Sequence, residues 1–316
     1  MTQIAILDDY QNVAKSIVDW ERLPQNASLT VFNDHIFDQE VLVDRLKNFE
    51  VICAMRERTP FPRSVLEQLP NLKLVITTGM RNASIDVTAA RELGIDVSGT
   101  GSVPYPTAEL TWALVLDLAR NISIENEAVK SGVWQTKMGV GLKGKTLGLI
   151  GLGNLGSQVA KYGNAFGMNV IAWSQNLTQE KAAESFASLV SLDTLMSTSD
   201  FVSIHTVLSK RTTGLIDLEK LKLMKKSAYL INTSRGPIVD ENALIEVLDK
   251  GLISGAGLDV FDIEPMDMKH PLILSGRTTI TPHIGYVTKE TYDVFFEDTL
   301  ECVISYINGT SLRLIN

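Results

Sequence analysis

Short apolar runs alternate with helix-length segments over the first hundred residues. The runs Ile4–Leu7, Val51–Ala54 and Leu74–Thr77 predict strands, and Ser64–Gln68 and Val87–Leu93 predict helices. Strands that alternate with helices build a parallel sheet covered by helices. The N-terminal part of the chain is therefore predicted to be an α/β domain.

A segment rich in glycine, serine and proline, GIDVSGTGSVPYP, ends this region and predicts a domain boundary near residue 100. The next segment, Thr107–Arg120, begins directly after Pro106, a favoured opening for a helix. It is apolar on nearly every face, and a helix of this kind is buried. We expect it to lie between domains or between subunits.

The alternation of strands and helices resumes at Thr146–Ile150 and continues to a final helix predicted at Lys289–Asn308. Between these segments, further strands are predicted at Val170–Trp173, Phe201–Ile204, Tyr229–Asn232 and Gly255–Val260, with a short β-branched strand before Pro282. The second half of the chain is therefore predicted to contain a second α/β domain.

The run GLGNLG places Gly151, Gly153 and Gly156 in GxGxxG spacing between a strand and a helix. In this position the first glycine permits a tight turn, the second lets a diphosphate approach the backbone, and the third lets helix and strand pack closely. The helix N-terminus, with free N–H groups near Asn154 and Leu155, attracts the diphosphate. The run predicts a dinucleotide site, and the alternative is a glycine-rich turn without a ligand.

The residue after the second strand of such a domain reads the adenine ribose, through an aspartate or glutamate in NAD sites. Here that residue is Ser174, which accepts a ribose hydroxyl or a phosphate without repulsion. No arginine follows it, and the nearest cation is Lys181. The sequence predicts use of both NAD and NADP; the alternative is that another side chain restores selection of NAD.

The chain has four histidines, and His283, in TITPHIGY, is the strongest candidate for a general acid or base. The alternative is a histidine satisfied by the backbone. His205 ends the strand FVSIH, at the sheet edge where α/β proteins bind ligands. Solvated or capping roles are expected for His35 and His270.

Arg235 directly follows an apolar strand, in NTSRGPIVDE, so its guanidinium is expected at a strand end. A planar fork of five donors suits an α-keto carboxylate, whereas the alternative is a surface arginine. Glu264, in LDVFDIEP, can hold His283 in one tautomer and favour its imidazolium form. Asp259 and Asp262 compete for that role by proximity.

Composition excludes several other classes of protein. The 316 residues are 45% hydrophobic and 21% charged, which is ordinary for two globular domains. A net charge of -8 disfavours nucleic acid and anionic membranes as partners. The two cysteines form no disulfide framework and no metal motif, and neither a signal peptide nor an apolar run of roughly 20 residues is visible. We therefore predict a cytoplasmic protein without a metal.

The motifs GLGNLG, NTSRGPIVDE, LDVFDIEP and TPHIG, in this order, resemble the signatures of the D-isomer specific 2-hydroxyacid dehydrogenase family. The resemblance covers nearly the whole chain. Within the family, the chain is similar to the phosphoglycerate dehydrogenases and to the glyoxylate/hydroxypyruvate reductases. It implies two Rossmann-like domains of α/β class. An NAD(P)-binding domain at residues 101–286 would be inserted into a flavodoxin-like substrate domain, formed by residues 1–100 and 287–316.

The family's residue roles carry over onto matching positions. Arg235 would bind the substrate carboxylate and carbonyl, His283 would exchange the proton, and Glu264 would be its partner. Asp259 would contact the nicotinamide. The other residues implied along the cofactor are Gly151, Gly153, Asn154, Leu155, Gly156, Ser174, His205, Thr233, Ser234, Gly285 and Tyr286.

The chain departs from the family pattern beside the nicotinamide and in the substrate loop. The common HIGG is HIGY here, ending at Tyr286, and Val207 replaces a frequent proline. The candidates for substrate binding are Gly79, Met80 and Arg81, in the loop TTGMRNA, together with Arg56 and Arg58. Arg56 and Arg58 resemble the arginines that face the substrate in phosphoglycerate-type members of the family. The alternative is that both lie on an exposed loop and do not bind the substrate.

The resemblance implies an enzyme that interconverts a small 2-oxo acid and the (R)-2-hydroxy acid with a nicotinamide cofactor. Closure about hinges near Ser98–Ser102 and Gly285–Lys289 is expected to exclude water, and a homodimer is expected from the apolar helix. The alternatives are a 3-phosphoglycerate dehydrogenase and an NAD(H)-sensing binding protein similar to the family's corepressors.

Overall fold

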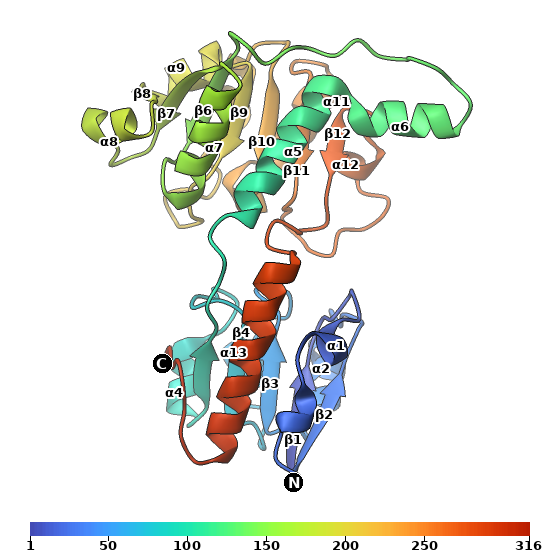
Figure 1. Ribbon diagram of the computed structural model, residues 1–316, viewed down its shortest axis with the longest axis vertical. Coiled ribbons are helices and arrows are strands. Elements are labelled where there is room, and N and C mark those ends of the chain that lie inside the picture. Colours follow the sequence, from blue (N-terminus) through green and yellow to red (C-terminus); the bar gives the residue numbers. More distant parts are fainter. The chain divides into compact units, whose positions relative to one another are not determined.

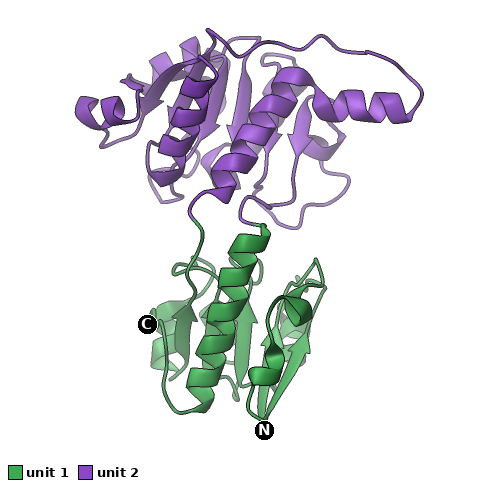
Figure 2. Cartoon of the chain, viewed as in Figure 1, with its two compact units in different colours: residues 1–103, 287–316 green, residues 104–286 purple.

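A computed structural model describes all 316 residues and divides the chain into two compact units (Figure 2). Unit 1 contains residues 1–103 and 287–316, and unit 2 contains residues 104–286. The first crossing lies after residue 103 rather than 100, because the chain after β5 (Asp96–Gly99) is still held to unit 1, where the Gly101 N–H donates to the Asp298 carboxylate. Ser98 is buried in β5, so the crossing lies at the C-terminal end of the range Ser98–Ser102 that was expected for a hinge; closure about it stays a prediction.

Unit 1 is a five-stranded parallel sheet in the order β2-β1-β3-β4-β5. This is the flavodoxin-like order, with a switch point between β1 and β3. Its other strands are β1 (Thr2–Ile6), β2 (Ala27–Val31), β3 (Val51–Ala54) and β4 (Leu74–Thr77). Its helices are α1 (Ala14–Ile17), α2 (Gln39–Leu46), α3 (Arg63–Leu66), α4 (Val87–Glu92) and the long α13 (Lys289–Ile307), which returns to this unit from the end of the chain (Figure 1).

Unit 2 is a seven-stranded parallel sheet in the order β12-β11-β10-β9-β6-β7-β8. The strands are β6 (Thr146–Ile150), β7 (Asn169–Trp173), β8 (Ser188–Leu189), β9 (Phe201–Ile204), β10 (Tyr229–Asn232), β11 (Gly255–Leu258) and β12 (Thr278–Ile280). The order reverses between β6 and β9, as in Rossmann domains. The predicted fold class, two parallel-sheet α/β domains, is confirmed.

Helices cover both faces of the larger sheet, which explains why its central strands are buried throughout. They are α5 (Pro106–Arg120), α6 (Ile122–Lys130), α7 (Asn154–Ala165), α8 (Gln179–Glu184), α9 (Leu192–Thr198), α10 (Leu218–Leu223), α11 (Glu241–Asp249) and α12 (Pro271–Leu274). No helix in the structure combines the length and the apolar character needed to cross a membrane.

Helix α5 packs on the sheet of its own unit, against β10, β11 and α7 (Figure 1). Its side chains Leu114 and Leu118 lie over Gly257 of β11, at a distance that leaves little room for a Cβ there. The expectation that this helix lies between domains is therefore wrong, because burial within unit 2 accounts for its apolar residues. The expectation of a subunit contact stays a prediction.

Candidate active site

The loops that carry the predicted site residues of unit 2 all follow the carboxyl ends of parallel strands. Such ends meet at one edge of a sheet, and ligands bind there at the switch point. The loops after β6, β7, β9, β10, β11 and β12 begin at Gly151, Ser174, His205, Thr233, Asp259 and Thr281, respectively. The fold thus brings these loops, distant in sequence, to a common edge.

Three glycines give the loop after β6 its shape, but only two of them are required by the packing of the chain. Gly151 has φ +100°, and a Cβ there would lie 2.7 Å from the carbonyl carbon of His205. A Cβ on Gly156 would overlap the carbonyl oxygen of Gly151. A Cβ on Gly153 would meet no atom within 4 Å. The space beside Gly153 is therefore open to a ligand.

Helix α7 starts directly after Gly153, and no side chain caps its N-terminus. The first N–H groups of a helix have no partner within the helix, and they carry the positive end of its dipole. An uncapped terminus beside an open glycine fits the diphosphate of a dinucleotide. Asn154 and Leu155 contribute the first N–H groups, as the sequence predicts for a bound diphosphate.

His205 is half-buried behind this loop, and its Nε2 lies 2.9 Å from the hydroxyl of Ser203. Desolvation by burial lowers the pKa of His205 to about 4. The ring is therefore uncharged at neutral pH. Its backbone, which packs against Gly151, helps to define the floor of the loop.

Arg235 is half-buried on a loop that is held by the side chain of Asn232, at the end of β10, and by the backbone of the loop after β9. The Asn232 amide donates to the Arg235 carbonyl over 2.9 Å, and its oxygen accepts from the Ser234 N–H over 3.0 Å. The Ser234 hydroxyl donates to the Thr206 carbonyl over 2.5 Å. The Arg235 guanidinium donates to the Ser234 carbonyl over 2.7 Å. This ordered setting does not fit the alternative of a surface arginine.

His283 and Glu264 form a close pair, with 2.5 Å between Nδ1 and Oε2. Their side chains are 20% and 29% exposed, respectively, so both groups remain accessible. The second oxygen of Glu264 accepts from the Phe261 N–H over 2.8 Å, which fixes the plane of the carboxylate. The ring of Tyr286 meets the His283 ring edge-on, at 5.7 Å between centroids.

Asp259 is buried, and both of its oxygens bind the loop that carries His283. One accepts from the Thr281 hydroxyl and the Ile284 N–H, over 2.6 and 2.8 Å, and the other from the Gly285 N–H over 2.9 Å. Burial raises the pKa of Asp259, opposed by these donors and by His283. Of the three acids considered for contact with His283, only Glu264 makes a hydrogen bond to its ring. Asp259 anchors Gly285 to unit 2, and the chain leaves that unit after Tyr286, within the range Gly285–Lys289 expected for a hinge; closure about it stays a prediction.

Ser174 begins a turn after β7, where its carbonyl accepts from the Leu177 N–H over 3.1 Å. The side chain is half-buried, and the residues that follow it up to Leu177 carry no charge. The position therefore offers a hydroxyl in place of a carboxylate.

Thr233 is buried beside α5, with its hydroxyl 2.7 Å from that of Thr111. The sequence reasoning did not identify Thr111 or Asn232, although both hold the loop after β10. Asn232 is the polar last residue of an otherwise apolar strand, and this signal could have identified it.

The predicted substrate residues belong to unit 1, at the carboxyl ends of β3 and β4. Arg56 has φ +50°, and its guanidinium donates to the Thr78 carbonyl over 2.9 Å. It lies so close to Gly79 that a Cβ on the glycine would collide with it. Met80 and Arg81 are exposed at the tip of the loop.

Arg58 and His35 are held by the loop after β1. The Arg58 guanidinium donates to the Asp8 carbonyl over 2.7 Å and lies 4.5 Å from the centroid of the Tyr10 ring. Both Arg56 and Arg58 are half-buried, so the alternative that they lie on an exposed loop is wrong.

The solvated or capping role expected for His35 is also wrong, because its side chain is buried with Nδ1 2.8 Å from the Asp8 carboxylate. His270 does cap a helix, α12, as expected.

Comparisons with known proteins identify relatives of this chain. The profile described as "D-isomer specific 2-hydroxyacid dehydrogenase, NAD binding domain" matches residues 112–285. A glyoxylate reductase of Thermococcus litoralis is 37% identical over 279 residues, which cover 85% of this chain and 84% of that protein. A crystal structure of a phosphoglycerate oxidoreductase of Vibrio cholerae superimposes with a TM-score of 0.94 at 35% identity, covering 98% of this chain and 100% of that one. A D-lactate dehydrogenase of Aquifex aeolicus, complexed with NAD and lactic acid, has a TM-score of 0.76 at 29% identity, covering 97% and 96%.

The chain belongs to the D-isomer specific 2-hydroxyacid dehydrogenase family. It is an NAD-dependent oxidoreductase that transfers a hydride between the nicotinamide and a 2-hydroxy or 2-oxo acid.

Proposed function

We propose that the protein reduces a small 2-oxo acid to the (R)-2-hydroxy acid and catalyses the reverse reaction, with His283, Glu264 and Arg235 as its catalytic residues. The observation that carries the proposal is the 2.5 Å contact between His283 and Glu264 at the carboxyl edge of the larger sheet. Gly236, next to Arg235, packs against the backbone of Phe261, so the loop of the arginine adjoins the loop of the glutamate.

Each of these side chains has a distinct task in the proposed reaction. The bound nicotinamide supplies or receives the hydride. Arg235 binds the carboxylate and polarises the carbonyl of the 2-oxo acid through its planar fork. Because Nδ1 of His283 faces Glu264, Nε2 is the atom that gives a proton to the substrate oxygen in reduction and takes it back in oxidation. The Glu264 charge stabilises the imidazolium that donates this proton.

A panel of 2-oxo acids tests the substrate class. We expect turnover with at least one of glyoxylate, hydroxypyruvate and 2-ketobutyrate. A second candidate, oxidation of 3-phosphoglycerate, is supported by Arg56 and Arg58, which sit half-buried at a strand end of unit 1. Preference for the phosphorylated acid would favour that candidate. Binding of NADH without turnover of any acid would indicate a nucleotide-sensing protein and overturn the proposed activity.

The finer cofactor proposal is that NADPH is used as well as NADH. Ser174 supports it, because a hydroxyl does not repel a 2′-phosphate. We expect kcat/KM values for the two cofactors to differ by less than about 100-fold, or about 3 kcal/mol. Ser174→Asp should lower kcat/KM for NADPH at least about tenfold and preserve that for NADH. A wild-type enzyme that does not use NADPH would contradict dual use.

A homodimer is also proposed, supported by apolar side chains on α6 and the segment that follows. No residue of α6 is buried, although Ile122, Ile124 and Val129 are apolar. Trp134 and Met138 are 76% and 95% exposed.

A cytoplasmic location is proposed as well. The two cysteines support it, because they are buried free thiols of the kind found in reducing compartments.

A further inference from the structure

We propose that Glu241, together with His270, is a positioning residue that sets the contact between Glu264 and His283; the proposal rests on the function proposed above. Glu241 is the first residue of α11, and its side chain is only 20% exposed. Its carboxylate binds the loop after β11 at two points that are far apart along that loop. The sequence alone assigns no role in the reaction to Glu241 or to His270.

The first contact is made close to Glu264. The Asp262 N–H donates to Oε2 of Glu241 over 3.4 Å, and the preceding N–H, of Phe261, donates to Glu264 over 2.8 Å. Two consecutive peptide groups are thus bound by the two glutamates. A shift of the peptide at Asp262 moves its neighbour at Phe261, and with it the carboxylate that faces His283.

The second contact is made at the other end of the loop. Nε2 of His270 lies 3.2 Å from Oε1 of Glu241. Nδ1 of His270 accepts from the Leu272 N–H at the start of α12, over 3.3 Å. Because Nδ1 is an acceptor, the ring proton is on Nε2 and points at Glu241. Glu241 therefore receives N–H donors from both ends of the segment Asp262–His270.

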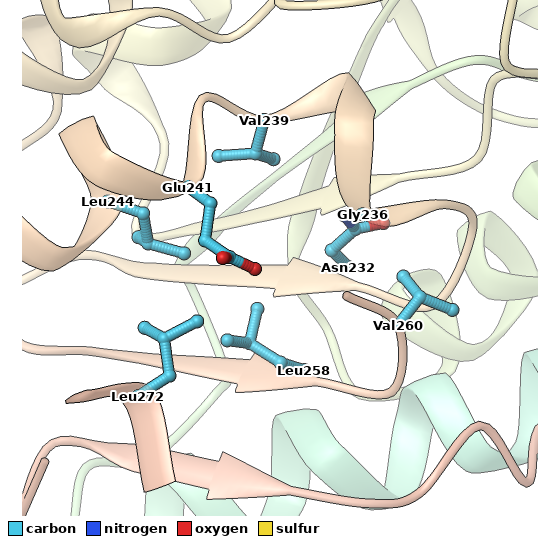
Figure 3. A pocket seen from close by; sticks show the side chains of 8 residues that line it. All are labelled: Asn232, Gly236, Val239, Glu241, Leu244, Leu258, Val260 and Leu272. Atoms are coloured by element: carbon cyan, nitrogen blue, oxygen red, sulfur yellow. The ribbon is translucent and has the colours of Figure 1, made fainter. Parts of the chain in front are cut away.

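The surroundings of Glu241 connect it to the arginine loop as well. Figure 3 shows the Glu241 carboxylate pointing into a small cavity lined also by Asn232 and Gly236. The cavity volume of about 10 Å³ has room for about one water molecule. Asn232 fixes the backbone of Arg235, and Gly236 packs against Phe261. Glu241 thus lies where the loops of Arg235 and Glu264 meet.

Charge distinguishes this role from simple packing. Asp262 and Asp240 are the other acids near Glu241. The pKa of Asp262 is raised by burial and by the negative charges of Glu241 and Asp240. His283 itself faces Glu264 and Asp259. A glutamine at position 241 has one acceptor oxygen and one amide donor, so it satisfies one of the two N–H groups and opposes the other.

The test is Glu241→Gln, with Glu246→Gln as the matched control. Glu246 lies on the same helix and pairs with Lys250 at the surface. For Glu241→Gln we expect kcat for reduction to fall about tenfold, with KM for NADH unchanged. We expect the midpoint of the pH profile of kcat/KM to move about half a pH unit lower, because the imidazolium of His283 loses part of its counter-charge. Glu246→Gln should leave all three quantities unchanged.

A double variant separates positioning from a general structural effect. If Glu241 acts through Glu264, Glu241→Gln has no further effect on the pH midpoint in a Glu264→Gln background. Additive shifts, or a lower kcat with an unchanged midpoint, would overturn the proposal. If Glu241→Gln does not fold, His270→Asn is judged by the same criteria, because its side chain keeps an acceptor oxygen for the Leu272 N–H but is too short to donate to Glu241.

A measurement that needs no substrate keeps the proposal independent of the proposed reaction. The His283 ring resonances can be titrated by NMR in the free protein, which has only four histidines. We expect the His283 midpoint to move to lower pH in Glu241→Gln and to stay unchanged in Glu246→Gln. An unchanged midpoint in both variants would refute the positioning role, even if turnover is found. A shifted midpoint without turnover would support positioning and reject only the proposed activity.

Discussion

His283 has a φ of +53°, in the left-handed region that most side chains avoid. The conformation is held by Asp259, which accepts from the backbone of Ile284 and Gly285 directly after the histidine. Asparagine, aspartate and histidine tolerate this region better than other residues with a Cβ. A substitution at this position therefore changes backbone strain as well as chemistry, and the choice of variant matters.

We expect His283→Asn to lower kcat by about 10² to 10⁴, the contribution of a positioned acid or base. The Kd for NADH, measured by fluorescence titration, should stay nearly constant. His283→Ala should lose as much activity and also lower the free energy of unfolding by about 1 kcal/mol relative to His283→Asn, because alanine is strained at positive φ. Substantial turnover by His283→Asn would sink the assignment of the proton-exchanging residue.

His205 predicts a pH dependence of stability. Burial lowers its pKa in the folded protein to about 4, from an ordinary value of 6.5. Between these values the unfolded chain binds a proton that the folded protein does not, so the stability that His205 contributes is full above pH 6.5 and is lost as the pH falls towards 4. In urea unfolding without cofactor, wild type should lose about 1–2 kcal/mol more than His205→Gln between pH 7 and pH 5. Equal losses would show that His205 titrates normally.

At the scale of elements, burial on both faces decides which strands can be predicted from the sequence. Val51–Ala54 and Phe201–Ile204 are buried throughout, and the structure gives them the predicted bounds. β2 (Ala27–Val31) was not predicted, because it is an edge strand in which every residue is only half-buried. β5 (Asp96–Gly99) was hidden in a glycine-rich segment, since its strand conformation comes from pairing with β4.

The strand, glycine loop and helix around GLGNLG predict opposite outcomes for two similar substitutions. Gly153→Ala should fold as stably as wild type, because its Cβ faces open space at an ordinary φ of -85°. It should raise the Kd for NADH at least about tenfold by keeping the diphosphate from the backbone. Gly156→Ala should cost about 1–3 kcal/mol of unfolding free energy, because its Cβ overlaps the Gly151 carbonyl.

Urea unfolding and isothermal titration of both variants measure these effects. Unchanged NADH affinity in a fully folded Gly153→Ala would show that the diphosphate does not bind there.

At the scale of the whole molecule, the chain crosses between its two units twice, after Val103 and after Tyr286. Each unit has its own parallel sheet and its own hydrophobic core. The site residues are accordingly divided by topology, with the cofactor and catalytic candidates in unit 2 and the substrate candidates in unit 1.

The exposed apolar side chains of α6 and its following segment predict a dimer. Light scattering at micromolar concentration should give about twice the 34.7 kDa mass of the chain. Trp134→Glu should shift the mass towards the monomer, because it places a charge in the contact. Leu274→Glu, at a similarly exposed apolar position on α12, is the control and should remain dimeric. A monomeric wild type would exclude this proposal.

The sequence by itself determined the fold class, the family and the edge of the sheet at which the chemistry lies. It could do so because glycine spacing and polar residues at strand ends are local features, and because parallel strands bring their carboxyl ends together. Proximity along the chain left Asp259, Asp262 and Glu264 as competitors for contact with His283; the family resemblance favoured Glu264, and only the tertiary structure shows the contact itself. These acids share one short loop, and their roles differ only in the direction of each side chain. Burial of His35 and the anchoring of Arg56 across Gly79 likewise depend on contacts between distant segments, which no local pattern encodes.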